Sequence, residues 1–324
     1  MLLQTCWEML ESNVTAQRIT EFIITGLDHL PNKKILGLLI LVTYSLILLG
    51  SSTNICIIAS DRHLHRPMYI FICNLAVIDI MFTTSASTTL IALLLAGVRN
   101  ISYHSCISRM FVYHLGDICL CFALTLMAFD RMIAISNPLR YHSILTNSRT
   151  FALIALSWMI GIAVIGVLTG IIDRLPYCQP LLKYSFCDYP VLVRAACVDP
   201  EPYFVPSTIL VMWLLGGHFP LILATYVKII YTVVRLADTE GRKQMISTCL
   251  SHAVAVFCYY APKLVSGLLT RVGVTLNLTE RNALMIISTL VPSLMNPTVY
   301  CFRTKEIRSR LIQILKRNRA LAIK

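Results

Sequence analysis

Seven long apolar runs constrain this chain more than any other feature. A lipid bilayer requires about 20 mostly apolar residues in each helix that crosses it, and every run meets that length. The runs cover approximately Ile35–Ser60, Met68–Ala96, Cys106–Ser136, Phe151–Ile172, Tyr203–Leu236, Met245–Thr270 and Asn282–Phe302. Glycine and proline interrupt the fifth and seventh runs, which a bundle tolerates because neighbouring helices can satisfy the freed carbonyl groups. The sequence therefore predicts an all-α membrane protein, a bundle of seven transmembrane helices.

Composition supports a membrane protein over a soluble one. Hydrophobic residues make up 56% of the 324 residues and charged residues only 14%, which leaves too few charges to cover a water-soluble surface. The net charge of +12 does not indicate a nucleic-acid partner, because the basic residues cluster beside apolar runs and not on a polar domain. The expected partner of these cations is membrane lipid.

Basic residues also predict the orientation. Arginine and lysine gather in alternate connections between the runs. They are Arg62, Arg66, Arg140, Arg149, Arg235, Arg242 and Lys243. Because basic loops remain in the cytoplasm, we expect residues 1–34 outside the cell, a seven-helix membrane domain over 35–302, and a cytoplasmic tail over 303–324. The tail has eight basic residues. Its segment Arg303–Leu315 is expected to form a short amphipathic helix on the inner leaflet, with Ile307, Leu311, Ile314 and Leu315 on its apolar side.

Sequons and cysteines agree with a multi-pass plasma-membrane protein. Asn13, Asn100 and Asn277 each begin an N-x-S/T sequon on the expected outside, which predicts glycosylation there. Four of the twelve cysteines also lie on that side. They are Cys106, Cys178, Cys187 and Cys197. The oxidising secretory path permits disulfides among them, but four cysteines allow three pairings and the residues alone do not choose.

Four motifs carry a family resemblance. The segment MAFDRMIAISNPLRY, Met127–Tyr141, resembles the signature MAYDRYVAICxPLRY of the olfactory receptors, which are rhodopsin-like G-protein-coupled receptors. It departs from that signature at Phe129, Met132 and Ser136. Three further motifs agree in order and spacing: LHRPMYIF (Leu64–Phe71), ISTCLSH (Ile246–His252) and PSLMNPTVY (Pro292–Tyr300). YYAPKLVSGLLTRVG and CFRTKEIRSRL are similar to class I, or fish-like, members of the family.

The resemblance implies an activation machinery. Asp130 would hold Arg131 at rest, and ligand binding would free Arg131 for a heterotrimeric G protein. Asn296, Pro297 and Tyr300 match the family's NPxxY, and Tyr226 matches a tyrosine that meets Tyr300 and Arg131 in active receptors. From the residues alone, the acid–base pair has a second interpretation, an exposed pair at a helix end that is worth less than about 1 kcal/mol.

A lone acid, Asp79, lies within the second run, where an unpaired charge is costly. By resemblance, Asn54 and Asn296 surround it in a polar core that is a candidate sodium site. Leu120 stands where many olfactory receptors have a glutamate, so the resemblance leaves sodium binding open. We expect no other metal and no cofactor. The resemblance also chooses the disulfides, Cys106 with Cys187 and Cys178 with Cys197.

Polar residues in the outer halves of the third, fifth and sixth runs predict the binding site for a small-molecule odorant. They are Tyr113, His114, Asp117, His218, Tyr260, Lys263 and Arg271. By resemblance to class I receptors, Arg271 would hold a ligand carboxylate, which a guanidinium binds through charge-assisted hydrogen bonds. Lys263 and Asp117 either neutralise one another, which we favour, or contact an acidic or zwitterionic ligand.

The resulting expectation is a receptor that couples an odorant to a stimulatory G protein and cyclic AMP. Two alternatives keep seven spans: a chemoreceptor of the same fold expressed outside the nose, and a membrane transporter. We find no convincing repeat between the halves of the sequence, which disfavours a transporter. An enzyme is not expected, since the histidines are scattered and no nucleophile motif or glycine-rich phosphate loop is present.

Overall fold

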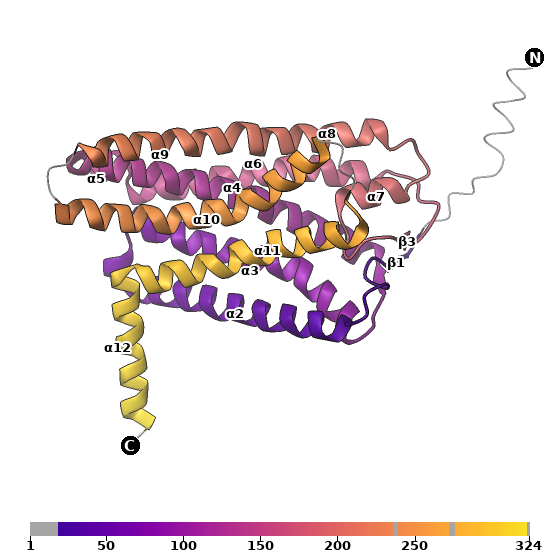
Figure 1. Ribbon diagram of the computed structural model, residues 1–324, viewed down its shortest axis with the longest axis horizontal. Helices are drawn as coiled ribbons and strands as arrows, with labels where there is room; N and C mark the ends of the chain where they lie inside the picture. The colour runs from indigo at the N-terminus through magenta and orange to yellow at the C-terminus, as the bar shows by residue number, and fades with distance from the viewer. Residues whose placement is uncertain (1–18, 236–238, 272–275, 323–324) are drawn as a thin grey trace, which may run out of the picture.

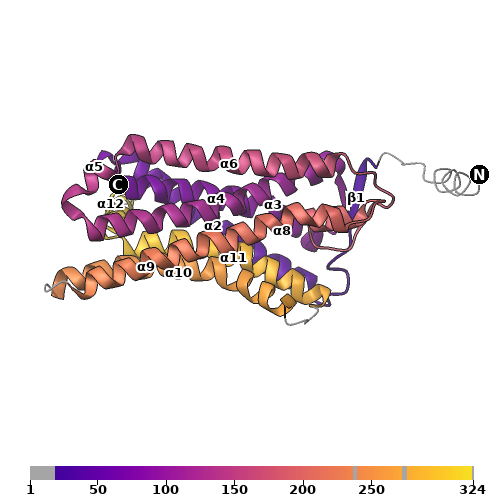
Figure 2. The ribbon, with the colours of Figure 1, turned by 90° about the horizontal axis from the view of Figure 1, so that it is seen from above.

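The structure is a computed structural model that describes residues 19–235, 239–271 and 276–322. Its long helices are α2 (Lys33–Ser60), α3 (Pro67–Leu95), α4 (Tyr103–Ser136), α6 (Asn147–Asp173), α8 (Glu201–Trp213), α9 (Phe219–Val234), α10 (Thr239–Arg271), α11 (Leu278–Arg303) and α12 (Lys305–Ala322). All of them except α12 lie side by side in one bundle, and α12 points away from the bundle (Figures 1 and 2).

Within the described residues, six helices are long and apolar enough to cross a membrane, with α8 and α9 counted as one continuous helix. A shorter apolar helical stretch, Cys249–Val265 within α10, supplies the other span. The outward faces are apolar: Leu39 of α2 is 60% exposed and Met159 of α6 is 67% exposed. Large exposed apolar faces are unfavourable in water and favourable in lipid. The predicted seven-helix membrane bundle is therefore confirmed.

Proline shapes the fifth and sixth spans. Between α8 and α9 the chain makes a π-helical turn, Leu214–His218, directly before Pro220. Because proline lacks an N–H, it cannot bond to the carbonyl four residues earlier, and a π turn accommodates that missing bond. The bend of α10 in Figure 1 falls in its second half, which contains Pro262.

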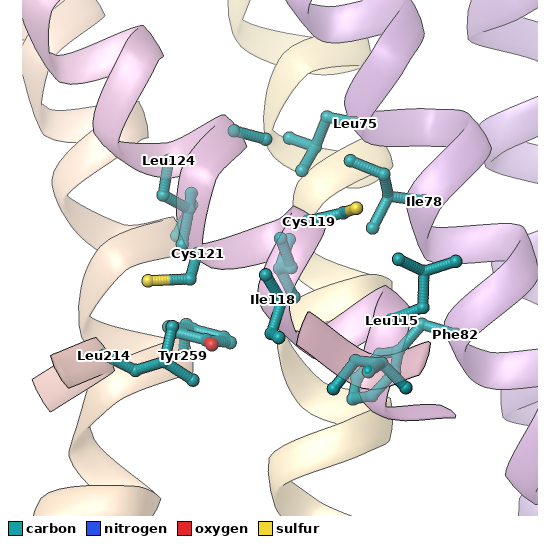
Figure 3. Close-up of a cluster of buried hydrophobic side chains, with 14 of the residues drawn as sticks. Leu75, Ile78, Phe82, Leu115, Ile118, Cys119, Cys121, Leu124, Leu214 and Tyr259 are labelled. Carbon is teal, nitrogen blue, oxygen red and sulfur yellow. The ribbon is translucent and has the colours of Figure 1, made fainter. Parts of the chain in front are cut away.

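The core of the bundle lies between α3, α4 and α10 (Figure 3). There Ile78 and Phe82 of α3 pack with Ile118 of α4, and all three are at most 1% exposed. Gly116 permits the close approach of α3 and α4, because a Cβ at that position would lie only 2.8 Å from the Cβ of Phe82. These contacts make α4 the central helix that positions the residues of the candidate sites.

One end of the bundle, which we name the sheet end, carries the strands β1 (Glu21–Ile24), β2 (Asn100–Ser102) and β3 (Leu181–Leu182) together with the short helix α7 (Tyr189–Ala195) (Figure 1). Strand β1 pairs antiparallel with β2 and parallel with β3. Gly26 follows β1, and a Cβ there would collide with the backbone of Tyr184. The sequence does not predict this sheet, because strands of two to four residues have too short a pattern to recognise.

The opposite end, the tail end, carries η1 (Arg62–Leu64), η2 (Pro138–Arg140), α5 (Tyr141–Ile144) and α12. Ile307 of α12 is completely buried, as expected for its apolar side. Arg310 forms a 2.5 Å ion pair with Asp61, and the pKa of that carboxyl is lowered, first by the backbone N–H of His63 and then by Arg310. The helix is longer than the expected Arg303–Leu315, and the side chains of Ile314 and Leu315 lie outside the described residues.

Candidate functional site

The acid–base pair of the signature motif lies at the tail end of α4. Arg131 donates from Nε and Nη2 to Oδ2 of Asp130 at 2.9 and 2.6 Å. Tyr141 of α5, which the sequence analysis did not single out, donates to the other carboxylate oxygen at 2.6 Å. Burial and the nearby charge of Asp130 raise the pKa of the Tyr141 hydroxyl. Because Asp130 is only 1% exposed, the geometry favours an ionic lock over an exposed pair at a helix end.

Tyr226 of α9 contacts α10 in this structure. Its hydroxyl lies 2.8 Å from Nδ1 of His252 and 3.2 Å from the carbonyl of Cys249. Nε2 of His252 lies 3.1 Å from the carbonyl of Leu124 in α4. Since a carbonyl only accepts, Nε2 of His252 carries a proton and donates it to Leu124, and the Tyr226 hydroxyl donates to the carbonyl of Cys249. His252 thus ties α4, α9 and α10 together; its signal in the sequence was the last position of the ISTCLSH motif.

The polar core predicted around Asp79 is brought together. Asn296 of α11 donates from Nδ2 to both carboxylate oxygens of Asp79 at 3.1 Å, and Asn54 of α2 donates to the carbonyl of Pro297 at 3.5 Å. Among the described residues, the side-chain oxygens of Asn54 and Asn296 have no hydrogen-bond partner. A buried carboxylate with free amide oxygens is a donor set that suits a hydrated hard cation such as sodium.

An ion pair joins α4 to α10 nearer the sheet end. Lys263 donates to Asp117 at 2.6 Å, and its ammonium lies 4.6 Å from the ring centre of Tyr259. The hydroxyl of Tyr259 donates to the backbone carbonyl of Asp117 at 3.0 Å. Both charged side chains stay partly accessible, at 24% for Lys263 and 17% for Asp117. This geometry matches the first of the two roles that the sequence left open, mutual neutralisation.

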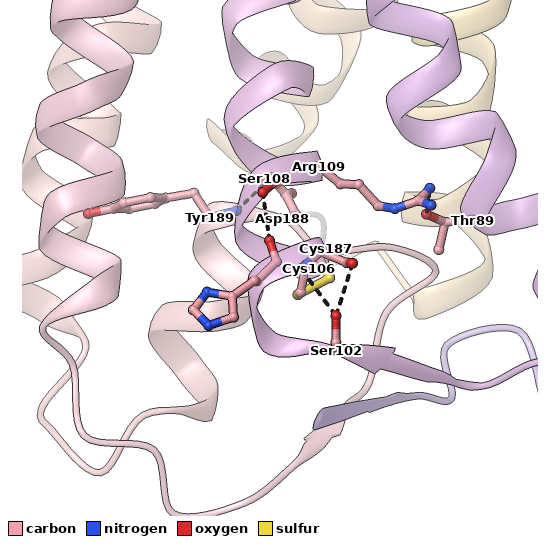
Figure 4. Close-up of a disulfide and its surroundings, with 10 residues drawn as sticks. Thr89, Ser102, Cys106, Ser108, Arg109, Cys187, Asp188 and Tyr189 are labelled. Carbon is pink, nitrogen blue, oxygen red and sulfur yellow. Dashed lines mark hydrogen bonds between the residues drawn. A yellow bond between two sulfur atoms is a disulfide. The ribbon is translucent and has the colours of Figure 1, made fainter. Parts of the chain in front are cut away.

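Closer to the sheet end than that pair, the long loop between α6 and α8 is bonded to α4. Cys187 of the loop bonds to Cys106 of α4 (Figure 4), and Cys178 bonds to Cys197. This is the pairing that the resemblance implied. Directly after the first disulfide, Asp188 accepts from His114 at 3.0 Å and from the backbone N–H of Tyr189. The disulfide therefore places the carboxylate of Asp188 beside the face of α4 that also carries Asp117.

Three other predicted ligand residues occupy separate positions. Tyr113 reaches α11, where its hydroxyl lies 3.2 Å from Thr289. Tyr260 lies 3.1 Å from the thiol of Cys121. His218 lies 3.1 Å from Thr125. Thr125 is about 12 Å further along α4 than Asp117. Only 6% of His218 is exposed, so it lies deeper than the Lys263 pair and is not brought together with it.

Tyr300 of α11 is 6% exposed, and its hydroxyl has no hydrogen-bond partner within the described part of the chain. The other predicted residues are two asparagines of the sequons and two residues outside the described part. Asn100, in β2, donates to Glu21 at 3.2 Å. Asn277 caps α11 through reciprocal 2.9 Å bonds with Glu280. Both are exposed at the sheet end, and their glycosylation stays a prediction. Asn13 and the side chain of Arg271 lie outside the described residues.

Comparisons with known proteins identify relatives of this chain. The family model described as "Olfactory receptor" matches residues 40–318. Olfactory receptor 10G4 of Homo sapiens is 34% identical over 302 residues, covering 92% of this chain and 96% of that protein. Olfactory receptor 10G7 of Homo sapiens is 36% identical over 313 residues, covering 94% and 96%. Olfactory receptor 10D1B of Mus musculus is 34% identical over 304 residues, covering 92% and 95%.

Proposed function

This chain belongs to the olfactory receptor family, so we propose that its tail end activates a stimulatory heterotrimeric G protein and raises cyclic AMP when an odorant binds between its helices. It is an odorant-sensing G-protein-coupled receptor and a multi-pass membrane protein, not an enzyme. The observation that carries the proposed coupling is the buried lock of Asp130 with Arg131 and Tyr141. Released from Asp130, the guanidinium of Arg131 would be the cation that a G protein contacts.

The orientation that suits this function places the sheet end outside the plasma membrane and the tail end in the cytoplasm. Two sequons, at Asn100 and Asn277, lie at the sheet end. The basic connections and α12 lie at the tail end, where α12 would rest on anionic lipid through its basic residues. Residues 1–34 would then be extracellular, 35–302 the receptor domain and 303–324 the cytoplasmic tail.

For the ligand, we propose a small carboxylate-bearing odorant that binds beside the Asp117–Lys263 pair. The ion pair supports a binding site at this position, because two charges that neutralise one another give the site a polar lining without a net charge. Arg271 follows on the same helix and would supply the cation for the carboxylate. His114, Tyr113 and Tyr260 would border the ligand, with His218 at greater depth.

Replacing Arg271 by alanine is expected to remove the response to short carboxylic acids and to leave the response to other active compounds unchanged. The measurement is cyclic-AMP output from cells challenged with acids, amino acids, alcohols and amines. Arg174→Ala, at an exposed cation that ends α6, is the matched control. If Arg271→Ala reaches the surface and still responds to acids as the wild type does, the carboxylate anchor is wrong. If no compound raises cyclic AMP in the wild type, the proposed signalling fails.

Breaking the Asp117–Lys263 pair from one side is expected to lower stability by about 1–3 kcal/mol, because a partly buried charge loses its partner. Lys263→Met and Asp117→Leu should each lower the melting temperature of the purified receptor. The double variant should recover part of the loss, since two apolar side chains leave no unpaired charge. Strictly additive losses in the double variant would contradict the pairing.

A further inference from the structure

A cavity of about 440 Å³ opens at the sheet end, between the loop that precedes α8 and the first turn of α11. Three cationic side chains line it: Lys183 after β3, Arg194 in α7 and Arg281 in α11. All three are exposed. They come from segments that are far apart in the sequence, and only the fold places them around one space.

Cationic side chains outnumber acidic ones around this cavity. Its one acidic lining residue is Asp188, whose carboxylate already accepts from His114 and from the N–H of Tyr189. Among the ion pairs within the described part of the chain, none includes Lys183, Arg194 or Arg281. A cavity with cations on its wall and low-dielectric protein behind them concentrates a positive potential and attracts anions.

Apolar surface lies beside the cations. Leu181, Pro190 and Val191 line the same space, and the guanidinium of Arg194 lies over the ring of Phe204 at 5.0 Å. Stacking on a ring holds the guanidinium plane while its N–H edges remain free to donate. This combination suits an organic anion with a short hydrocarbon chain better than it suits a bare inorganic ion.

The cavity is also connected to the face of α4 that carries Asp117. Asp188 lines the cavity and at the same time bonds to His114 of α4. His114 and Asp117 are three residues apart on α4, so they lie on one face of that helix. The Asp188–His114 contact therefore links the lining of the cavity to the side of α4 that carries the Asp117–Lys263 pair.

We propose that this cavity is a second, outer binding site that captures small organic carboxylates before they enter the pocket between the helices. The inference rests on the proposed function in placing the sheet end outside and in naming carboxylates as ligands. Electrostatic capture accelerates association and weakens with salt, whereas the inner pocket completes recognition.

The binding experiment isolates the outer site. The receptor carries Arg271→Ala, which removes the proposed inner anchor, and sits in nanodiscs of zwitterionic lipid. Fluorine NMR follows the binding of 6,6,6-trifluorohexanoate, with 6,6,6-trifluorohexanol as the neutral probe. We expect the carboxylate to bind more tightly than the alcohol, and Arg194→Gln with Arg281→Gln to weaken the carboxylate about five- to tenfold. Arg174→Gln, an exposed cation away from the cavity lining, should leave its affinity unchanged.

Salt supplies a second criterion. The dissociation constant for the carboxylate should rise between about 50 and 300 mM salt and that of the alcohol should not, as expected for an electrostatic site. Equal affinities with and without the two arginines, in variants that melt at the wild-type temperature, would overturn the outer site. Cyclic-AMP output is scored separately: binding with no signal would contradict the proposed signalling and leave the outer site standing.

Discussion

Replacing Cys106 by serine is expected to remove most of the receptor from the cell surface. The Cys106–Cys187 disulfide closes a loop with a sequence separation of 81 residues, and loop-closure entropy assigns about 4.5 kcal/mol to a bridge of that length. A loss of that size is a large part of the stability of a typical domain. Surface staining of an epitope at the N-terminus, compared with total protein, measures the effect.

The second bridge and a free cysteine are the controls for this result. Cys178–Cys197 spans 19 residues, for which the same relation gives about 3 kcal/mol, so Cys178→Ser should retain more surface protein than Cys106→Ser. Cys56, an exposed free cysteine of α2, should tolerate serine. A Cys106→Ser receptor at wild-type surface level would show that the loop is held by other contacts.

Replacing Asp130 by asparagine is expected to raise cyclic AMP in the absence of odorant severalfold. The carboxylate is buried. It accepts two hydrogen bonds from Arg131 and a third from Tyr141. A neutral amide of the same shape removes the charge attraction, which is stronger than a neutral hydrogen bond, and so frees the guanidinium. The basal signal of transfected cells, normalised to surface expression, is the measurement.

Two variants separate the lock from general damage to the tail end. Tyr141→Phe removes one hydrogen bond but keeps the ion pair, so its basal signal should rise less than that of Asp130→Asn. Arg131→Ala should show neither basal nor odorant-dependent signal, because it lacks the group that the lock restrains. Equal basal signals in Asp130→Asn and wild type, with normal surface expression, would mean that this pair does not restrain activation.

Local patterns were sufficient for the spans and the motifs. The length and hydropathy of a run depend only on neighbouring residues, so each helix of the bundle could be predicted without knowing its partners. One predicted break was confirmed, since Pro220 of the fifth run follows the π-helical turn. The seventh run was expected to be interrupted, but α11 continues through Pro292 and Pro297, and Pro262 of α10 was not singled out. By contrast, β1 of four residues and β3 of two were not predicted, because strands this short depend on pairing across distant segments.

The candidate sites divide in the same way. Asp130, Arg131, Asp79 and Lys263 stood out in the sequence because a charge inside an apolar run is costly wherever it points. The sequence also suggested the partners of Lys263 and Asp79, which are Asp117 and Asn296. Other contacts were not predicted: Tyr141 with Asp130, His252 with Tyr226 and Asp188 with His114 involve partners that are ordinary residues in sequence. Each becomes significant only through a contact of 2.6 to 3.0 Å.

The sequence by itself determined that this chain crosses a membrane seven times and carries the motifs of an olfactory receptor, because hydropathy and motif are properties of contiguous residues. Only the tertiary structure decided that Lys263 is neutralised by Asp117. It also decided that Lys183, Arg194 and Arg281 surround one cavity whose lining has a single acidic residue, Asp188. The physical reason is that charge compensation depends on distance in space, which the order of residues along a chain does not specify.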